Sequence, residues 1–518
     1  MAIHNVILLT NNSDTSLVTA NILIKNGKLK LVSTSELDED PDLYSLDAEG
    51  GYLLGNLNID HPPEFIILKQ DPTQKYNVWL DFETNLIFAI QGNVIHRNRL
   101  KKYFANAEGS VDKNLNVSWL AYTPPPFALP IRYGEVSKWN YWNTKHFSGV
   151  FTAAVGLDRL YWINENSENK TLVNDLASSA GGEIRGYRFG AVGKINFLNQ
   201  SWGYTLFLAT HSFEKGFDDT NMDQLSLFDY RLDIPISKQI TMSIGKQKEP
   251  ISMERVSSSL FNQMQERVSD AFLPGRNIGV QLSGTLLKDK ASWAVGTFNP
   301  WIEKPGPFDE NETVLMSRIT GVVNDNGWFP GLLHLGITNR YATGRHSLQY
   351  QIKPEFNQAP VFINTDSIET NTKNLVCGEI SYTYGPFWVF SEYTHNRLQT
   401  NSTSDMVFSS YHITASWVLT GESRTYNRKN GTLNPIPVAK SVDLKGWGAW
   451  ELCARFSSYN LNSNYMEENV MNIFSLGING WLTNWACISI NYRYIRTYKS
   501  GLNGIANGFN TRIMLLLS

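Results

Sequence analysis

Apolar and polar residues alternate along an extended stretch in the last quarter of the chain. Its two sets of alternating positions are Tyr411, Ile413, Ala415, Trp417 and Leu419 on one side, and His412, Thr414, Ser416 and Thr420 on the other. Successive side chains of a β-strand point to opposite faces of the sheet. The stretch therefore predicts a strand with one apolar and one polar face.

Three further stretches show the same alternation. Their apolar positions are Trp202, Tyr204, Leu206 and Leu208; Gly448, Trp450, Leu452, Ala454 and Phe456; and Phe509, Ile513, Leu515 and Leu517. Glu451 and Arg455 lie on the opposite face of the second stretch, and Asn510 and Arg512 lie opposite the third. We expect the last stretch, at the end of the chain, to be a closing strand.

The alternation fits a soluble β-sandwich and a transmembrane β-barrel equally well. The 518 residues are 42% hydrophobic, with a net charge of −3 and a mean hydropathy of −0.27, and no run approaches the roughly 18 apolar residues of a spanning helix. A membrane barrel hides its hydrophobicity by alternation, so this composition does not exclude one. Tyr and Trp at the segment ends, charges on the polar faces and long polar stretches between shorter turns favour the barrel.

A collinear set of segments resembles the phosphate- and polyphosphate-selective porin family. The run 243–280, with Lys246-Gln-Lys-Glu-Pro250 and Leu273-Pro-Gly-Arg276 in it, resembles the segment that folds into the pore in that family. Segments 294–299, 390–395, 411–427 and 446–455 resemble its later strands, in the same order. The resemblance covers residues 180–518.

This resemblance implies an all-β fold, with residues 146–518 forming an antiparallel transmembrane barrel of about 16 strands. It also implies a homotrimer in the outer membrane of a Gram-negative cell, in contact with its lipid. The expected function is passive diffusion of anions, among them phosphate or polyphosphate, or of small polar solutes, with no role for nucleic acid. The chain ends on Ser518, whereas outer-membrane proteins usually end on an aromatic residue.

A selective pore needs charge where its lumen is narrowest, because low-dielectric walls strengthen the field there. The cations of the inward segment are Lys246, Lys248, Arg255, Arg267 and Arg276, and those of the wall are Arg231 and Arg455, with Arg188, Lys194, Arg318, Arg493 and Arg512 as further candidates. Arginine binds oxyanions through charge-assisted and often bidentate bonds. The resemblance implies that these residues form the anion-binding constriction.

Acidic residues interleave these cations and favour a second interpretation. They are Glu249, Glu254, Glu266 and Asp270 in the segment, and Asp229 and Asp233 around Arg231. We expect Arg255 and Arg267 to lock the segment in place more than to bind ions. Alternation also puts Lys246 on the same face as the apolar residues unless the strand ends or bulges at Gly245. An exterior lysine such as Lys429 should have little effect on ion selectivity.

The first hundred residues resemble a different family, the metal-dependent amidohydrolases. Segments 20–29, 46–55 and 59–61 resemble that family's N-terminal strands, and 64–72 and 87–96 resemble the strands that close its small sandwich. The catalytic (β/α) barrel of about 250 residues that separates these halves is missing. His61, followed by two prolines, is then a turn residue, since a hydrolytic metal needs several protein ligands.

We therefore expect residues 1–105 to form a catalytically inactive β-sandwich on the periplasmic side, joined by a linker, residues 106–145. Pro124, Pro125 and Pro126 make the linker stiff and extended, and an SH3-type ligand is the less favoured interpretation of these prolines. The N-terminus has no basic region or cleavage site of a secretory signal, so we interpret the chain as a mature or trimmed form.

No catalytic residue, metal site or cofactor is expected. Cys377, Cys453 and Cys487 lack metal-ligand spacing and lie in strand patterns, which indicates packing. Two alternatives to an anion porin remain. One is a general or substrate-specific porin whose periplasmic appendage binds a partner, and the other, disfavoured, is an amidohydrolase-type enzyme.

Overall fold

The computed structural model describes most of the chain. The described residues are 2–8, 18–25, 28–34, 45–48, 50–69, 86–91, 94–98, 101–102, 140–144, 146–197, 200–210, 225–237, 239–258, 262–304, 311–324, 330–400, 404–462 and 468–517. The chain divides into two compact units, Met1–Lys113 and Asn114–Ser518. Most of the expected linker, 106–145, lies outside the described residues.

The first unit is a nine-stranded sheet. Its strands are β1 (Ala2–Leu8), β2 (Val18–Lys25), β3 (Lys28–Ser33), β4 (Ser45–Asp47), β5 (Tyr52–Asn56), β6 (Glu64–Leu68), β7 (Leu86–Gln91), β8 (Val94–Asn98) and β9 (Lys101–Lys102). β1 pairs antiparallel with β2 and parallel with both β4 and β5. Apolar side chains from β1 to β7 share one buried cluster, so the sheet curls over a core of its own.

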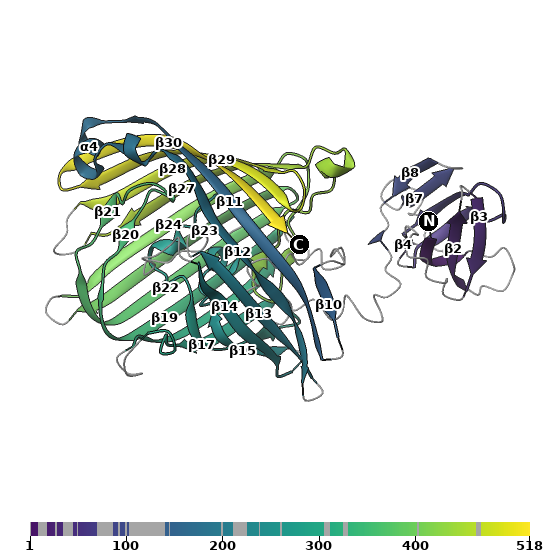
Figure 1. The fold of residues 1–518 in the computed structure, drawn as a ribbon, viewed down its shortest axis with the longest axis horizontal. Helices are drawn as coiled ribbons and strands as arrows, with labels where there is room; N and C mark the ends of the chain where they lie inside the picture. Colours follow the sequence, from purple (N-terminus) through teal and green to yellow (C-terminus); the bar gives the residue numbers. More distant parts are fainter. Residues whose placement is uncertain are drawn as a thin grey trace. The chain divides into compact units, whose positions relative to one another are not determined.

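The second unit is a closed antiparallel barrel of 16 strands (Figure 1). They are β11 (Phe147–Glu165), β12 (Gly181–Phe197), β13 (Gln200–Thr210), β14 (Leu225–Pro235), β15 (Ile240–Gln247), β16 (Asn277–Leu286), β17 (Ala291–Phe298), β18 (Thr313–Asn324), β19 (Leu332–Leu348), β22 (Ile368–Tyr384), β23 (Phe387–Thr400), β24 (Met406–Val418), β27 (Ala449–Asn460), β28 (Asn469–Trp481), β29 (Ala486–Lys499) and β30 (Leu502–Leu517). β30 closes the barrel by pairing with β11 from Ala153–Leu517 to Glu165–Ala506. The short strand β10 (Tyr141–Asn143) pairs with residues 148–150 of β11 on the same edge as β30, because β12 occupies the other edge. The predicted strand number and closing strand are confirmed.

Burial in the barrel wall is the reverse of burial in a soluble protein. In β24, Ile413 is 50% exposed while its neighbours His412 and Thr414 are buried, and the pattern repeats along the strand. The apolar face therefore points away from the barrel and the polar face into it, as a membrane barrel requires. In the described part of the chain, no helix has both the length and the apolar character needed to cross a bilayer.

In the part of the barrel that the structure describes, three connections fold back into the lumen. Two of them, 248–276 and 349–367, follow β15 and β19 and so enter at one end, while 419–448 follows β24 and enters at the opposite end. They contain α5 (Met253–Val256) and the 3₁₀ turn Ser269–Ala271 in the first, β20 (Gln351–Ile352) and β21 (Ile363–Asn364) in the second, and β25 (Tyr426–Asn427), β26 (Thr432–Leu433) and the 3₁₀ turn Val442–Leu444 in the third. α4 (Ser167–Val173) and the 3₁₀ turn Leu176–Ser179 connect β11 to β12.

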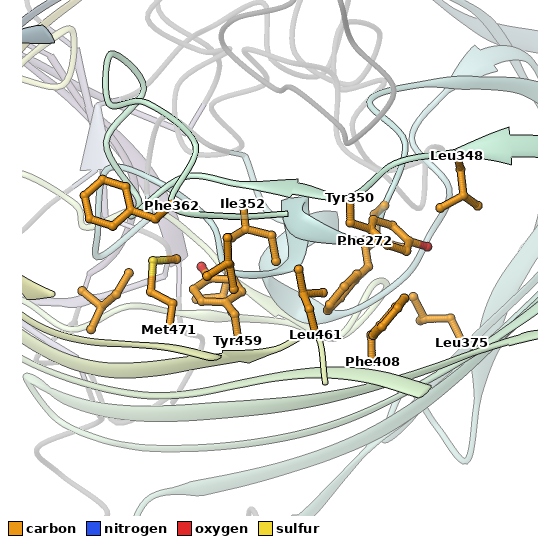
Figure 2. Close-up of a cluster of buried hydrophobic side chains, with 14 of the residues drawn as sticks. Phe272, Leu348, Tyr350, Ile352, Phe362, Leu375, Phe408, Tyr459, Leu461 and Met471 are labelled. Atoms are coloured by element: carbon orange, nitrogen blue, oxygen red, sulfur yellow. The ribbon is translucent and has the colours of Figure 1, made fainter. Parts of the chain in front are cut away.

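The lumen is apolar at the end where two of these segments enter. Tyr350, Ile352 and Phe362 of segment 349–367 pack with Phe272 of segment 248–276 (Figure 2). The wall supplies inward-pointing apolar side chains to the same cluster, among them Leu375, Phe408, Tyr459 and Met471. A barrel interior is usually polar because it faces water. Here the apolar side chains of the wall pack against apolar side chains of the inward segments instead.

The orientation of the apolar face predicts the effect of a charge placed on it. Ile413→Arg, in the middle of β24, should destabilise the barrel in lipid vesicles by about 2–4 kcal/mol, because the bilayer centre cannot solvate arginine. Leu419→Arg, one residue beyond the end of this strand, should cost only about 0–1 kcal/mol. Urea unfolding in vesicles measures both, and equal costs would contradict a lipid-facing β24.

Candidate pore and its charged lining

The inward segment 248–276 is fixed by hydrogen bonds to the wall opposite its point of entry. Gln263 Nε2 donates to Ser416 of β24 at 3.0 Å, and Gln265 Nε2 donates to Ser489 of β29 at 3.0 Å. The Asn491 side chain accepts from the Gln265 backbone N–H at 2.9 Å. The segment therefore crosses the lumen and narrows it.

Glu266 of this segment binds arginines from two strands of the wall. It accepts two bonds from Arg185 of β12, at 3.1 and 3.0 Å, and one from Arg512 of β30, at 2.7 Å. Arg512 also forms two 2.7 Å bonds with Asp158 of β11. All four side chains are buried, so the segment is tied to the barrel where its first and last strands meet.

Arg185 reaches this site because of a β-bulge. The pairing of β11 with β12 passes from Gly156–Gly186 to Leu157–Ile184 and leaves Arg185 as the extra residue. A bulge re-aims the side chain that it carries. Strict alternation in the sequence does not reveal this, and Arg185 was therefore missed.

Glu254 and Arg455 form a second tie between the segment and the wall. Arg455 Nη2 donates to Glu254 Oε1 at 2.9 Å, its Nη1 donates to the Glu266 carbonyl at 2.9 Å, and its Nε donates to Thr414 Oγ1 at 2.9 Å. Arg455 also lies 3.5 Å from Glu355 of the second inward segment. This predicted wall residue joins both segments to the barrel.

Three other candidate cations are also paired with carboxylates. Arg255 lies 2.6 Å from Asp270 within the segment, Arg276 donates to Asp229 at 3.0 and 3.3 Å, and Arg231 donates to Asp233 at 3.1 Å. The guanidinium of Arg276 also covers the Phe228 ring at 4.1 Å. Each of these three arginines therefore has a carboxylate partner.

Lys246 is not brought together with the other candidates. Its cross-strand partners are Tyr230 in β14 and Ile278 in β16. Both partners lie on the outward face of their strands, and directly paired residues share a face of the sheet. Its Nζ bonds Glu303 at 2.7 and 2.8 Å, and Tyr230 contacts the same carboxylate. Lys246 thus lies on the outward face, as expected from the alternation of apolar and polar residues along the strand.

Lys248 and Arg267 converge on one carbonyl inside the segment. Lys248 Nζ donates to the Ser257 oxygen at 3.0 Å, and Arg267 Nη2 donates to the same oxygen at 2.7 Å. Both residues are buried. Two positive charges are therefore held side by side within the part of the chain that narrows the lumen.

The third inward segment, 419–448, uses another predicted arginine. Arg318 of β18 donates to the carbonyls of Asn430 and Gly431, at 2.7 and 3.2 Å, and to Glu379 at 2.6 Å. Gly431 has φ +64° and lies so close to Thr320 that a Cβ would clash with that side chain. Lys429, expected to be an exterior lysine, belongs to this inward segment, where it is exposed.

The remaining wall candidates point inward with different degrees of burial. Arg188 and Arg493 are fully buried, and the Arg493 guanidinium covers the Phe356 ring of segment 349–367 at 4.3 Å. Lys194 is only partly buried.

Arg340 and Lys373 form a charged group that the sequence did not indicate. Arg340 of β19 bonds Glu249 of the inward segment at 2.5 and 3.2 Å and Glu312 at 2.8 Å, and Lys373 also bonds Glu312. Burial would raise the pKa of Glu312, but Arg340 and Lys373 lower it to about 2. Two cations and two carboxylates thus balance each other.

The family model of phosphate-selective porin O and P matches residues 165–502. The chain belongs to this family. It is an outer-membrane porin, built on the barrel described above. A search of curated protein sequences found no significant match.

The porin is also similar to solved porin structures, at low identity. They include outer-membrane OmpT of Vibrio cholerae (10% identity, TM-score 0.45, 73% of this chain and 100% of that one) and OprB of Pseudomonas putida (9%, 0.45, 72% and 94%). An anion-selective porin from Comamonas acidovorans is 12% identical, with a TM-score of 0.44 over 72% of this chain and 100% of that one.

In the first unit, the resemblance to amidohydrolases stays a prediction. His61 lies in the turn between β5 and β6, where its Nδ1 is 3.0 Å from the Ile59 carbonyl oxygen. The preceding Asp60 has φ +63° and pairs with Lys30 at 2.5 Å.

A double-mutant cycle on Arg185→Met and Glu266→Gln tests whether the inward segment of the porin is locked electrostatically. Because this pair is buried and bidentate, we expect a coupling energy of about 1–3 kcal/mol in unfolding experiments. The exposed pair Arg397–Asp405 is the control and should couple by about 1 kcal/mol or less. A coupling at Arg185–Glu266 no larger than at the control would contradict the lock.

Proposed function

We propose that the porin passes small anions and that Lys248 and Arg267 supply the positive field at its constriction. The observation that carries this proposal is the convergence of both side chains on the Ser257 carbonyl. Two like charges held together repel each other, and an anion beside them relieves this repulsion. The porin family to which the chain belongs supports phosphate as one such anion.

The paired arginines have a different role in this proposal. Arg185, Arg455 and Arg512 each bond a carboxylate inside the lumen, so the charge of each is largely balanced. They hold the inward segment against the wall and thereby fix Lys248 and Arg267. Preorganised charges cost little reorganisation when an ion passes.

Neutralising both cations tests this proposal. At about 1 kcal/mol per charge in a confined, partly dehydrated pore, Lys248→Gln with Arg267→Gln should lower the anion-to-cation permeability ratio roughly 30-fold. Reversal potentials in a KCl gradient across planar bilayers measure the ratio. Lys288→Gln, in the short turn between β16 and β17, removes an exposed charge as a control and should leave the ratio unchanged, because salt screens it.

Unchanged reversal potentials in the double variant would remove these two residues from the pathway. The second candidate, a general or substrate-specific porin, would then be favoured. Competition by phosphate against chloride current distinguishes phosphate preference from simple anion preference in the unmodified protein.

We further propose that the first unit lies in the periplasm and that the barrels form a homotrimer. The connections at the end where β11 begins include 198–199, 236–239, 287–290, 385–386 and 482–485, and short turns are typical of the periplasmic end. There the unit could bind the cell wall or another protein. The trimer rests on the resemblance to the family alone.

Deleting residues 1–105 should leave barrel insertion intact, because the first unit buries its own apolar core. Heat-modifiable migration in electrophoresis, with protease protection in vesicles, measures insertion. Loss of the folded barrel on deletion would make this unit part of the barrel's own assembly.

A further inference from the structure

A cluster of three metal-ligating side chains lies between the inward segment and the wall. Glu254 comes from α5, Glu392 from β23 and His412 from β24, where Glu392 and His412 are directly opposite each other. One ligand atom from each lies within 4.8 Å of the others. His412 Nε2 is 3.8 Å from Glu392 Oε2 and 4.0 Å from Glu254 Oε2.

These distances are too long for hydrogen bonds and leave buried atoms unsatisfied. Glu392 Oε2 and His412 Nε2 have no hydrogen-bond partner among the residues that the structure describes, although Glu392 is 3% exposed and His412 is 1% exposed. A buried polar atom without a partner destabilises the fold, so two of them facing one point indicate a missing ligand.

The surroundings orient both atoms toward that point. Glu392 Oε1 accepts the Glu254 backbone N–H at 3.0 Å, which turns Oε2 toward the histidine. His412 Nδ1 is 3.1 Å from Thr414 Oγ1, which also accepts Arg455 Nε. Assigning the ring proton to Nδ1 satisfies that contact and leaves a lone pair on Nε2, the arrangement of a metal-bound histidine with an outer partner.

Charge balance also favours a cation at this point. Arg455 offsets the charge of Glu254, whereas the described residues place no Lys or Arg in an ion pair with Glu392. Glu254 Oε2 already accepts the N–H groups of Val268 and Ser269, so it is the weakest of the three donors. An ionised Glu392 is costly to bury unless a positive charge joins it.

We propose that Glu392, His412 and Glu254 bind one divalent transition-metal ion. Imidazole with carboxylates suits Zn²⁺ and its neighbours in the first transition row, while Ca²⁺ and Mg²⁺ take oxygen ligands. Ligand bonds of about 2.0–2.2 Å require only a small contraction of the present separations. The ion joins the inward segment to two adjacent wall strands and holds the constriction in place.

The test uses the full-length porin in detergent, stripped with a chelator and then titrated with Zn²⁺ by calorimetry and with Co²⁺ by visible absorption. We expect one strong site per chain, with Co²⁺ d–d bands, and a loss of affinity of at least about 10–100-fold in His412→Gln and in Glu392→Gln. His395→Gln, on the opposite face of β23, is the matched control and should bind like the unmodified protein.

Heat-modifiable migration shows whether each variant has folded, and only folded variants are compared. Absence of strong binding in the unmodified protein would overturn the proposal, as would binding that His412→Gln and Glu392→Gln both leave unchanged. If the unmodified protein binds no metal strongly, a shared proton is left as the bridge between His412 and Glu392. If both variants bind metal like the unmodified protein, the metal is bound by other residues. Neither result bears on the anion selectivity proposed above, which is measured separately.

Discussion

The fold of the lumen depends on the cost of an unpaired charge in a confined space. Once a segment of chain enters a barrel, its carboxylates and guanidinium groups lose most of their water, and each must find a partner of opposite charge. Glu266 between Arg185 and Arg512, and Glu254 with Arg455, meet this requirement. Because removing one partner leaves the other buried and charged, these pairs fix where the segment lies more than they stabilise the fold.

A second constraint acts at the end of the barrel where two segments enter. The wall there turns apolar side chains such as Leu375 and Phe408 inward, which a water-filled barrel would not tolerate. Tyr350 and Phe362 of segment 349–367 cover them, so this end has a hydrophobic core of the kind found in soluble proteins (Figure 2). Apolar packing at one end and ion pairing across the middle thus hold the inward segments by different means.

The sequence predicted the barrel better than its lining. Alternation assigned the faces of β24 and β27 because a strand's period of two holds over many residues, and the number of strands followed from chain length. The lining was harder, since Arg185 depends on a bulge and Arg340 meets its carboxylates only through folding. The inward position of 419–448 could not be predicted from local pattern, because the residues that anchor it lie elsewhere in the sequence. Arg318 is in β18, and Glu451 is in β27.

The same reasoning separates the cations that bind the protein to itself from those that face a solute. A guanidinium with a bidentate carboxylate, such as Arg276 with Asp229, has little field left for an ion that passes. Counting basic residues in a porin sequence therefore overstates the positive charge of its pore. Selectivity depends on which charges face the solute, and those can be identified only after each buried pair has been assigned. In this porin the dense pairing makes the lining rigid. We propose that this rigid lining keeps Lys248 and Arg267 at fixed positions, where an anion meets them without reorganising the protein.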